Sequence, residues 1–417
     1  MNHKTYFLHL IKLYFSLNIS YHFFVAPHYS YIGLVNNFSS TNFIISIFII
    51  IFFSLMIKIN EDFLSNIFKA FFVVVSLIPA LTLFTFKAVG NLFITQWVSA
   101  FFFFILIFNS KINYKSVSVL PITATKNNLL IITIISFMIY LSTFGFNLNF
   151  EYFNIISETL YQGRESLTQK MSSIGILRYF FSNFQNVFLP FLLAFGIVKK
   201  NKTITLLSVL FFLYVFLSTT FKSVLLTPIL IVGTFILYQL TKTPLPILII
   251  KNAYKIVLAL CLFDYFLLFP FLNAVLVRRV FFLPALISEK YHIYFQENGF
   301  TYFSDLPFFE FLSINPFSQS IPETIGTYFI YNEGYMNAGF LADSFTKMGI
   351  FSVVLYLIVL KLLVSFSDSN KNFKDEFIIF SIVISPLIAL ANSSLTTTLF
   401  SHGLLLAFFV SSQIRKT

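Results

Sequence analysis

Long uninterrupted apolar runs dominate the pattern of hydrophobic and polar positions along this chain. Many of the runs approach the roughly 20 residues that a membrane-spanning helix needs. They are apolar on every face, whereas a strand that lines a polar-filled barrel alternates from residue to residue. Since only helices and closed barrels span a bilayer, the pattern predicts an all-α polytopic integral membrane protein.

The runs divide into about twelve spans, within a range of about eleven to thirteen. The first is the weakest, because it contains His9 and Lys12 and could instead be a signal peptide or an interfacial helix. We expect spans at residues 6–26, 43–57, 68–86, 92–108, 128–148, 179–197, 204–220, 224–240, 256–276, 338–364, 377–394 and 398–412.

Composition supports the membrane assignment. Of the 417 residues, 58% are hydrophobic and 10% are charged, whereas soluble proteins carry about a quarter charged residues. A large soluble core and a nucleic-acid-binding domain are therefore both excluded. The single cysteine, Cys261, permits no internal disulfide and no cysteine metal cluster.

The formal net charge of +11 indicates topology, because lysine and arginine are enriched in cytoplasmic segments. If both termini are cytoplasmic, fifteen of the 22 lysines, Lys69 among them, fall in cytoplasmic segments and only four fall outside. This orientation predicts a single membrane domain, 1–417, with two large outer loops at 149–178 and 277–337. The prolines and aromatic residues of the second loop predict short interfacial helices.

The arginines run against the lysine trend. Four of the five lie in or beside the two expected outer loops: Arg164, Arg178, Arg278 and Arg279. A guanidinium offers a planar fork of donors that matches a pyrophosphate, whereas a lysine is a point charge. The alternative is that each arginine pairs with a nearby carboxylate, as Arg278 would with Glu289. Exposed ion pairs add only about 0–1 kcal/mol, however, and give little reason to prefer arginine.

Four ionisable residues lie in or at the ends of expected spans, where a charge is costly unless it is paired or wetted. Lys222 either snorkels or reaches an anionic substrate. Asp264 is either a proton-coupling site or a hydrogen-bonded group that serves helix packing. Asp343 and Lys347 are four residues apart, the spacing at which they pair on one helix face, and we favour that pairing.

Several motifs are missing from the sequence. It contains no P-loop, no dinucleotide glycine fingerprint, no His-Glu-x-x-His pair and no Gly-x-Ser-x-Gly elbow. Nucleotide-driven transport, redox chemistry and zinc proteolysis are therefore disfavoured, and no metal or cofactor is expected. His292 is the one histidine of the second expected loop, where it is either a general base or a structural ring among aromatic residues.

Four stretches, in matching order, resemble the bacterial oligosaccharide repeat-unit polymerases, the O-antigen (Wzy-type) polymerases. They are LYQGRESL with Arg164, TTFKSVLLTP with Lys222, Ser223 and Pro228, RRVFFLPALISEKY with Arg278, Arg279, Pro284 and Tyr291, and NEGYMNAGFLADSFTKMGIFSVVL with Asn337, Gly339, Asp343 and Gly349. The resemblance covers most of residues 160–365 and rests on the order of the motifs. The stretch around Arg178 does not align with the family.

The resemblance implies a glycosyltransferase-C-like architecture in the bacterial inner membrane. Such enzymes transfer a growing glycan from undecaprenyl pyrophosphate to the non-reducing end of a new lipid-linked repeat unit at the outer face. The product is a surface polysaccharide such as O-antigen, capsule or exopolysaccharide, and a chain-length regulator protein is a further expected partner. No metal or nucleotide sugar is required, because the donor already carries its leaving group.

The resemblance and the arginine pattern together suggest roles for individual residues. We expect pyrophosphate to be bound by Arg164, Lys222, Arg278 and Arg279. We expect a carboxylate to activate the acceptor hydroxyl, with Glu289 as the first candidate and His292 as the second.

Two other classes of protein share parts of this pattern. A flippase or secondary transporter of lipid-linked oligosaccharide would also have about twelve spans, but it predicts charges scattered at mid-membrane depth and small loops. An O-antigen-type ligase shares the architecture and the outer-loop arginines. The concentration of charge in two large loops favours the polymerase.

Overall fold

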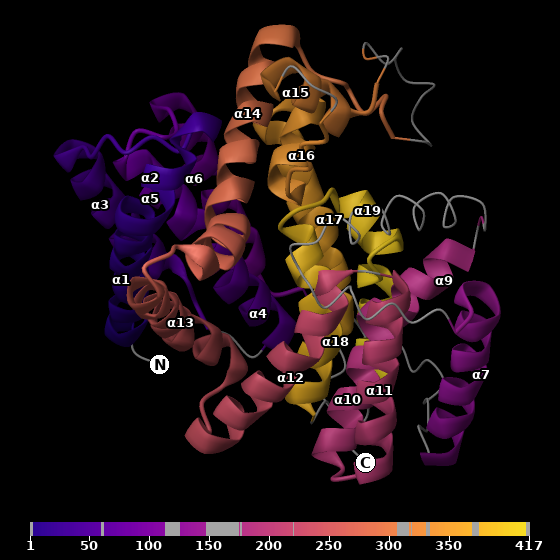
Figure 1. Ribbon diagram of the computed structural model, residues 1–417. Coiled ribbons are helices and arrows are strands. Elements are labelled where there is room, and N and C mark those ends of the chain that lie inside the picture. Colours follow the sequence, from indigo (N-terminus) through magenta and orange to yellow (C-terminus); the bar gives the residue numbers. More distant parts are fainter. Residues whose placement is uncertain are drawn as a thin grey trace. The chain divides into compact units, whose positions relative to one another are not determined.

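A computed structural model describes residues 3–59, 62–112, 126–146, 175, 177–219, 221–306, 317, 319–330, 334–368 and 375–413. Every regular element in these ranges is a helix, and none of these residues forms a strand (Figure 1). The prediction of an all-α protein is therefore confirmed.

Among these residues, seven helical segments are long and apolar enough to cross a membrane. They are Phe63–Thr85, Asn91–Asn109, Leu177–Val198, Lys202–Thr219, Ser223–Thr241, Leu245–Leu267 and Ile350–Asp368. Shorter apolar helices cover Ser40–Met56, Leu130–Phe144 and Glu376–Leu390. These segments are those of a polytopic membrane protein, whereas the division into twelve spans and the orientation stay predictions.

The chain forms two compact units, of which the first comprises Met1–Asn113, Pro244–Asp368 and Ala389–Leu395. In this unit α1 (His3–Ser20) packs on α13 (Leu245–Leu267) and α3 (Ser40–Met56). The most deeply buried segment is α4 (Phe63–Phe72), followed by η3 (Val73–Leu77) and α5 (Ile78–Thr85). Further pairs are α6 (Asn91–Asn109) with α17 (Ile350–Asp368) and α14 (Leu283–Asn298) with α16 (Phe340–Met348).

The second unit comprises Tyr114–Thr243, Ser369–Ile388 and Thr396–Thr417. Within it, the Tyr140 hydroxyl is buried and donates to the Phe181 carbonyl at 2.7 Å. Its helices are α7 (Lys126–Phe144), α9 (Leu177–Asn183), α10 (Leu189–Val198), α11 (Lys202–Thr219), α12 (Lys222–Thr241), most of α18 (Glu376–Leu390), most of α19 (Leu395–Phe400) and α20 (Leu404–Gln413).

Each π-helical segment in the described residues is followed, after one intervening residue, by a proline. The segments are η1 (Tyr21–Val25), η3, η5 (Phe184–Phe188) and η6 (Asn273–Phe282). The second residue of the next helix is in turn Pro27, Pro79, Pro190 and Pro284. A proline has no N–H to donate, and its ring clashes with the carbonyl four residues earlier. The wider π turn relieves this clash without ending the helix.

Three helix boundaries differ from the expected spans. The span expected at 256–276 is the helix Leu245–Leu267, which begins after Pro244 and contains two lysines. The span expected at 338–364 is interrupted at Gly349, whose φ of 62° separates α16 from α17. Lys69 is buried inside the helical segment Phe63–Thr85, which begins five residues before the expected span, and its cytoplasmic placement stays a prediction. Lysine positions alone therefore misplace helix ends by several residues.

Candidate functional site

The paired arginines lie on η6, the longest π-helical segment in the described residues. The guanidinium carbon of Arg278 lies 4.1 Å from the centre of the Tyr29 ring, and its Nε donates to the Ala274 carbonyl at 3.1 Å. Arg279 is exposed. Neither arginine forms an ion pair with any residue that the structure describes, so the pairing of Arg278 with Glu289 is not observed. Pro284 fixes the π-helical backbone that presents both side chains.

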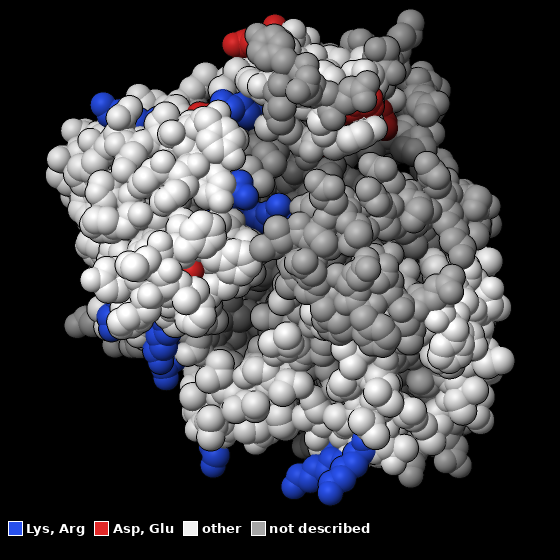
Figure 2. Space-filling view, in the orientation of Figure 1, with Lys and Arg blue, Asp and Glu red and all other residues white. Residues whose placement is uncertain are grey.

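The surface around basic side chains is mostly uncharged. On the face drawn in Figure 2, lysine and arginine atoms form several groups, and acidic atoms are few among the described residues. A single exposed guanidinium such as Arg279 can form two parallel hydrogen bonds to a phosphate.

Asp264 holds the beginning of η6 in place. Its carboxylate is buried and accepts hydrogen bonds from the backbone N–H groups of Leu272 at 2.9 Å and Asn273 at 2.7 Å. The Asn273 side-chain amide donates to the same carboxylate at 2.8 Å. These contacts favour the helix-packing interpretation of Asp264 over proton coupling, since a charge-assisted acceptor at a helix start satisfies otherwise unpaired N–H groups.

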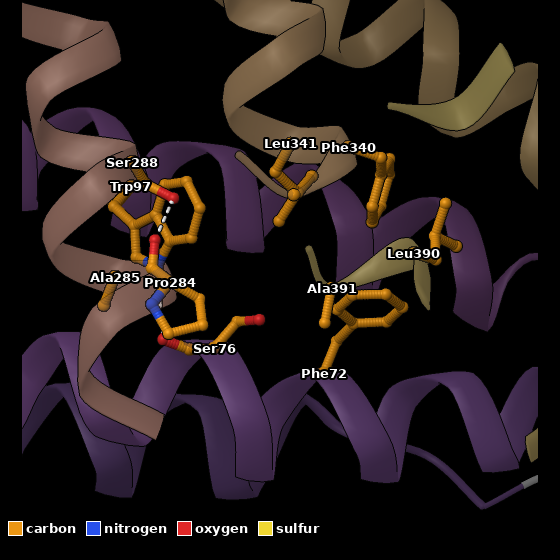
Figure 3. A pocket seen from close by; sticks show the side chains of 11 residues that line it. Phe72, Ser76, Trp97, Pro284, Ala285, Ser288, Phe340, Leu341, Leu390 and Ala391 are labelled. Carbon is orange, nitrogen blue, oxygen red and sulfur yellow. Dashed lines mark hydrogen bonds between the residues drawn. The ribbon is translucent and has the colours of Figure 1, made fainter. Parts of the chain in front are cut away.

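The third and fourth stretches of the family resemblance meet in the first unit. The Tyr291 hydroxyl on α14 donates to the Met336 carbonyl at 2.7 Å, and α14 packs on α16. A small crevice of about 10 Å³, room for roughly one water molecule, lies at this contact (Figure 3). It is lined by Phe72, Ser76, Trp97, Pro284, Ala285, Ser288, Gly339, Phe340, Leu341, Leu390 and Ala391.

Packing explains the glycine at the edge of this crevice. A Cβ atom on Gly339 would lie 2.4 Å from the Ala391 carbonyl oxygen, so a larger residue would push the two backbone segments apart. Asn337, two residues earlier, is exposed on an extended segment. Gly349 has a positive φ that favours glycine and ends α16.

Glu289 anchors the start of α6. Its side chain is 7% exposed, and Oε1 accepts the Gly90 N–H at 2.6 Å at the N-terminus of that helix. Oε2 lies 3.8 Å from the Lys290 ammonium. Burial raises the pKa of the Glu289 carboxyl, while the Gly90 N–H and Lys290 act against this shift. A carboxylate at a helix N-terminus stabilises the helix dipole, so this geometry gives Glu289 a structural role.

His292 is enclosed by aromatic rings. It is 2% exposed and stacks on Phe345 with 3.8 Å between ring centres, and Nδ1 lies 2.7 Å from Gln96 Oε1. Burial lowers the pKa of His292 to about 3, so the ring is neutral near pH 7. A buried ring does not reach a substrate hydroxyl, and the geometry favours the structural alternative.

Asp343 and Lys347 are close, but Lys347 has a nearer partner. The Lys347 ammonium is fully buried and donates to Asp305 Oδ2, whereas its distance to Asp343 Oδ1 is 3.7 Å. Thr301 Oγ1 also donates to Asp305, at 2.7 Å. The self-neutralising pair expected from sequence is therefore part of a larger group with two carboxylates.

Sequence reasoning missed a second group of buried charges in the first unit. Lys361 Nζ donates to Ser65 Oγ at 2.9 Å and lies 3.8 Å from Asp62. Lys69 donates to Asn109 Oδ1 at 3.1 Å, and Asp368 accepts backbone N–H groups at the start of α4. The charged residues at the ends of the apolar runs 63–85 and 350–368 were the only sequence signal for this group.

Several of the predicted site residues lie outside the described residues or in the second unit. Arg164 and nearly all of the expected loop 149–178 fall outside the described residues. Lys222 is the first residue of α12 in the second unit, but its side chain is not described. Arg178, also in the second unit, donates to the Tyr179 hydroxyl at 3.0 Å. The range 277–337 contains the end of η6, all of α14 and α15 (Ile321–Ile330).

No family model matches this chain, and no curated protein or solved structure is detectably similar to it. The fold thus defines the broad class, an all-helical membrane protein.

Proposed function

We propose that this protein polymerises lipid-linked oligosaccharide repeat units into a surface polysaccharide. The transferred glycan leaves undecaprenyl pyrophosphate and joins the sugar end of a second lipid-linked repeat unit. The reaction takes place at the outer face of a bacterial inner membrane.

One observation carries the proposal. The two best-described stretches of the family resemblance are separate in sequence but pack together, through α14 on α16 and the Tyr291 hydrogen bond to Met336. Residues of both stretches also line one crevice. Motifs that resemble a family only by chance have no reason to meet in one place.

The arginines supply the second line of support. Arg279 is exposed and Arg278 is held against Tyr29, so two guanidinium groups are presented on one rigid segment without a carboxylate partner among the described residues. Forked donors of this kind recognise phosphate groups better than lysine does. The chemistry fits the pyrophosphate of either the donor or the acceptor lipid.

Complementation of a deletion strain tests this function. The wild-type gene should restore a ladder of long glycan chains, whereas Arg279→Ala should leave single repeat units on the acceptor with normal protein abundance. Arg279→Lys should also fail if the forked geometry matters. Lys255→Ala, which removes an exposed cation of the same unit, should give a normal ladder. A normal ladder from Arg279→Ala would remove this arginine from the mechanism.

A transporter is the second candidate, because Lys69 and Lys361 are buried inside candidate spans. The same deletion strain separates the classes. Loss of a polymerase leaves single repeat units on the surface acceptor, and loss of a flippase leaves no surface glycan. Loss of a ligase leaves long glycan on its lipid carrier but none on the acceptor.

A further inference from the structure

Asp343 lies where four segments of the first unit meet. Lys347 faces it from α16 itself, and Asp305 faces it from the segment 301–305, which is bonded to the end of α16. Tyr291 on α14 and Tyr356 on α17 interact with it electrostatically. The two backbone bonds that fix segment 301–305 run from the N–H of Thr301 to Thr346 and from the N–H of Tyr302 to Lys347, both at 3.0 Å.

The charges at this point do not balance. Two carboxylates share one ammonium group, and Lys347 donates its hydrogen bond to Asp305. Of the described cations, only Lys347 lies within ion-pair distance of Asp343, at 3.7 Å. A poorly compensated carboxylate in a protein interior tends to accept a proton. Burial raises the pKa of Asp343, Asp305 raises it further, and Lys347 acts against the shift.

A hydroxyl group without a partner lies beside the two carboxylates. Tyr356 is 7% exposed, and its buried hydroxyl has no hydrogen-bond partner among the residues that the structure describes. It interacts electrostatically with both Asp343 and Asp305. Buried polar groups in proteins are nearly always hydrogen-bonded, so an unpaired hydroxyl points to a polar group that binds there.

Asp343 is also accessible. Its side chain is 15% exposed and that of Asp305 is 14% exposed, whereas Lys347 is completely buried. Glu289 and His292 are nearly inaccessible by comparison, and Glu289 is engaged at the start of α6. Asp343 and Asp305 are therefore both partly accessible, and Asp343 is the one that does not accept the hydrogen bond of Lys347.

We infer that Asp343 is the general base for the polymerisation proposed above, an inference that rests on that function. The acceptor hydroxyl transfers its proton to the Asp343 carboxylate while its oxygen bonds to the anomeric carbon of the donor glycan. The bond from that carbon to the pyrophosphate oxygen breaks, and its electron pair leaves with undecaprenyl pyrophosphate. Lys347 and Asp305 position Asp343.

This assignment also specifies which pyrophosphate the arginines bind. Arg279 and Tyr291 are twelve residues apart on one continuous helical stretch, which corresponds to roughly 18 Å along the axis. A pyrophosphate at Arg279 is therefore far from an anomeric carbon beside Asp343. The acceptor lipid can occupy both positions at once. Its pyrophosphate binds at the arginines, and its oligosaccharide extends along α14 to Asp343.

Kinetics of the full-length protein in vesicles, with a synthetic undecaprenyl-pyrophosphate-linked repeat unit, test the inference. Asp343→Asn should lower kcat by about 100-fold or more with little change in KM, whereas Arg279→Ala should mainly raise KM. Wild-type kcat should rise with pH as Asp343 loses its proton, and Asp343→Glu should retain part of the rate with a displaced pH profile. Glu297→Gln, an exposed carboxylate on α14, should behave like wild type.

These experiments distinguish failure of the proposed polymerase function from failure of Asp343 as the general base. If wild-type protein forms no polymer, the proposed function fails. If wild-type protein forms polymer and Asp343→Asn keeps a normal kcat, Asp343 is not the base. Should Asp343→Asn fail to fold, a pH profile of Asp343→Glu identical to wild type would overturn the inference in the same way.

Discussion

Two buried lysines of the first unit have similar surroundings but different charge balance. Lys347 and Lys361 are both fully buried, and each lies near two aspartates. Around Lys361, a second lysine, Lys69, makes two cations for the two carboxylates of Asp62 and Asp368. Around Lys347, one cation serves both Asp305 and Asp343.

The hydrogen bonds differ in the same way. In the Lys361 group, Asp368 accepts the backbone N–H groups of Leu64 at 3.0 Å and Ser65 at 3.1 Å, so it caps α4. In the Lys347 group, Asp343 is held only by an ion pair at 3.7 Å among the described residues. Balanced and hydrogen-bonded charges stabilise a fold, whereas an uncompensated carboxylate is available for chemistry. The two groups therefore differ in their number of cations and in the hydrogen bonds that hold their carboxylates.

The largest expected effect comes from breaking the balanced group. Lys361→Met should lower the free energy of unfolding by about 4 kcal/mol, because removing one partner of a buried pair leaves carboxylates uncompensated. Thermal unfolding of the purified protein in detergent measures this change, with Lys255→Ala as the exposed control. A loss no greater than that of the control would show that this group does not stabilise the fold.

Replacing Lys347 should lower the free energy of unfolding by less than replacing Lys361 does. A second substitution should restore part of that loss. Lys347→Met should lower the free energy of unfolding by about 3 kcal/mol, since Asp305 and Asp343 are slightly exposed and can take up protons. Adding Asp305→Asn should restore at least about 1 kcal/mol, as expected for coupled neighbours. Strictly additive effects in this double-mutant cycle would contradict the direct contact between Lys347 and Asp305.

A matched pair of substitutions compares the two groups directly. Asp368→Asn should destabilise the protein by about 2 kcal/mol, because it removes a charged acceptor from two backbone N–H groups. Asp343→Asn should leave stability unchanged or raise it, since its charge is poorly compensated. Equal losses from both variants in the same unfolding assay would erase the distinction between the groups.

The smallest expected effect is a pH dependence. Burial raises the pKa of Asp343 above the ordinary value of 3.8, so above that pH the folded protein keeps a proton that the unfolded chain releases. Stability from this group is therefore lost as pH rises through the window between 3.8 and the raised pKa. The melting temperature of Asp343→Asn, minus that of wild type, should increase with pH across this window. A constant difference would mean that Asp343 ionises normally.

The apolar runs predict much of the helical architecture, but the sequence predicts only part of the candidate site. The paired arginines and the spacing of Asp343 and Lys347 are local patterns, and both are present in the structure. The partner Asp305 is 42 residues from Lys347, and sequence spacing gives no indication of such a contact. The π turn that presents Arg278 is signalled by Pro284, yet a proline alone also predicts a helix start or a kink.

The degree of burial sets Glu289 and His292 apart from Asp343 as candidate general bases. Glu289 and His292 have the residue types that a general base requires, but sequence did not reveal that one caps α6 and the other is enclosed by Phe345 and its neighbours. Lys69 was assigned to a cytoplasmic segment because lysine usually marks the membrane boundary. Lys69 is buried, and its carbonyl and amide partners come from Lys58, just after α3, and from Asn109, the last residue of α6, while its side of the membrane stays a prediction.

Release of undecaprenyl pyrophosphate in proteoliposomes tests the central claim most directly. Vesicles that contain the purified protein and a lipid-linked repeat unit should form a glycan ladder and release one undecaprenyl pyrophosphate for every linkage made. Arg279→Ala and Asp343→Asn should suppress both products together. Movement of the lipid-linked glycan across the vesicle membrane, without chain growth or pyrophosphate release, would contradict the polymerase account.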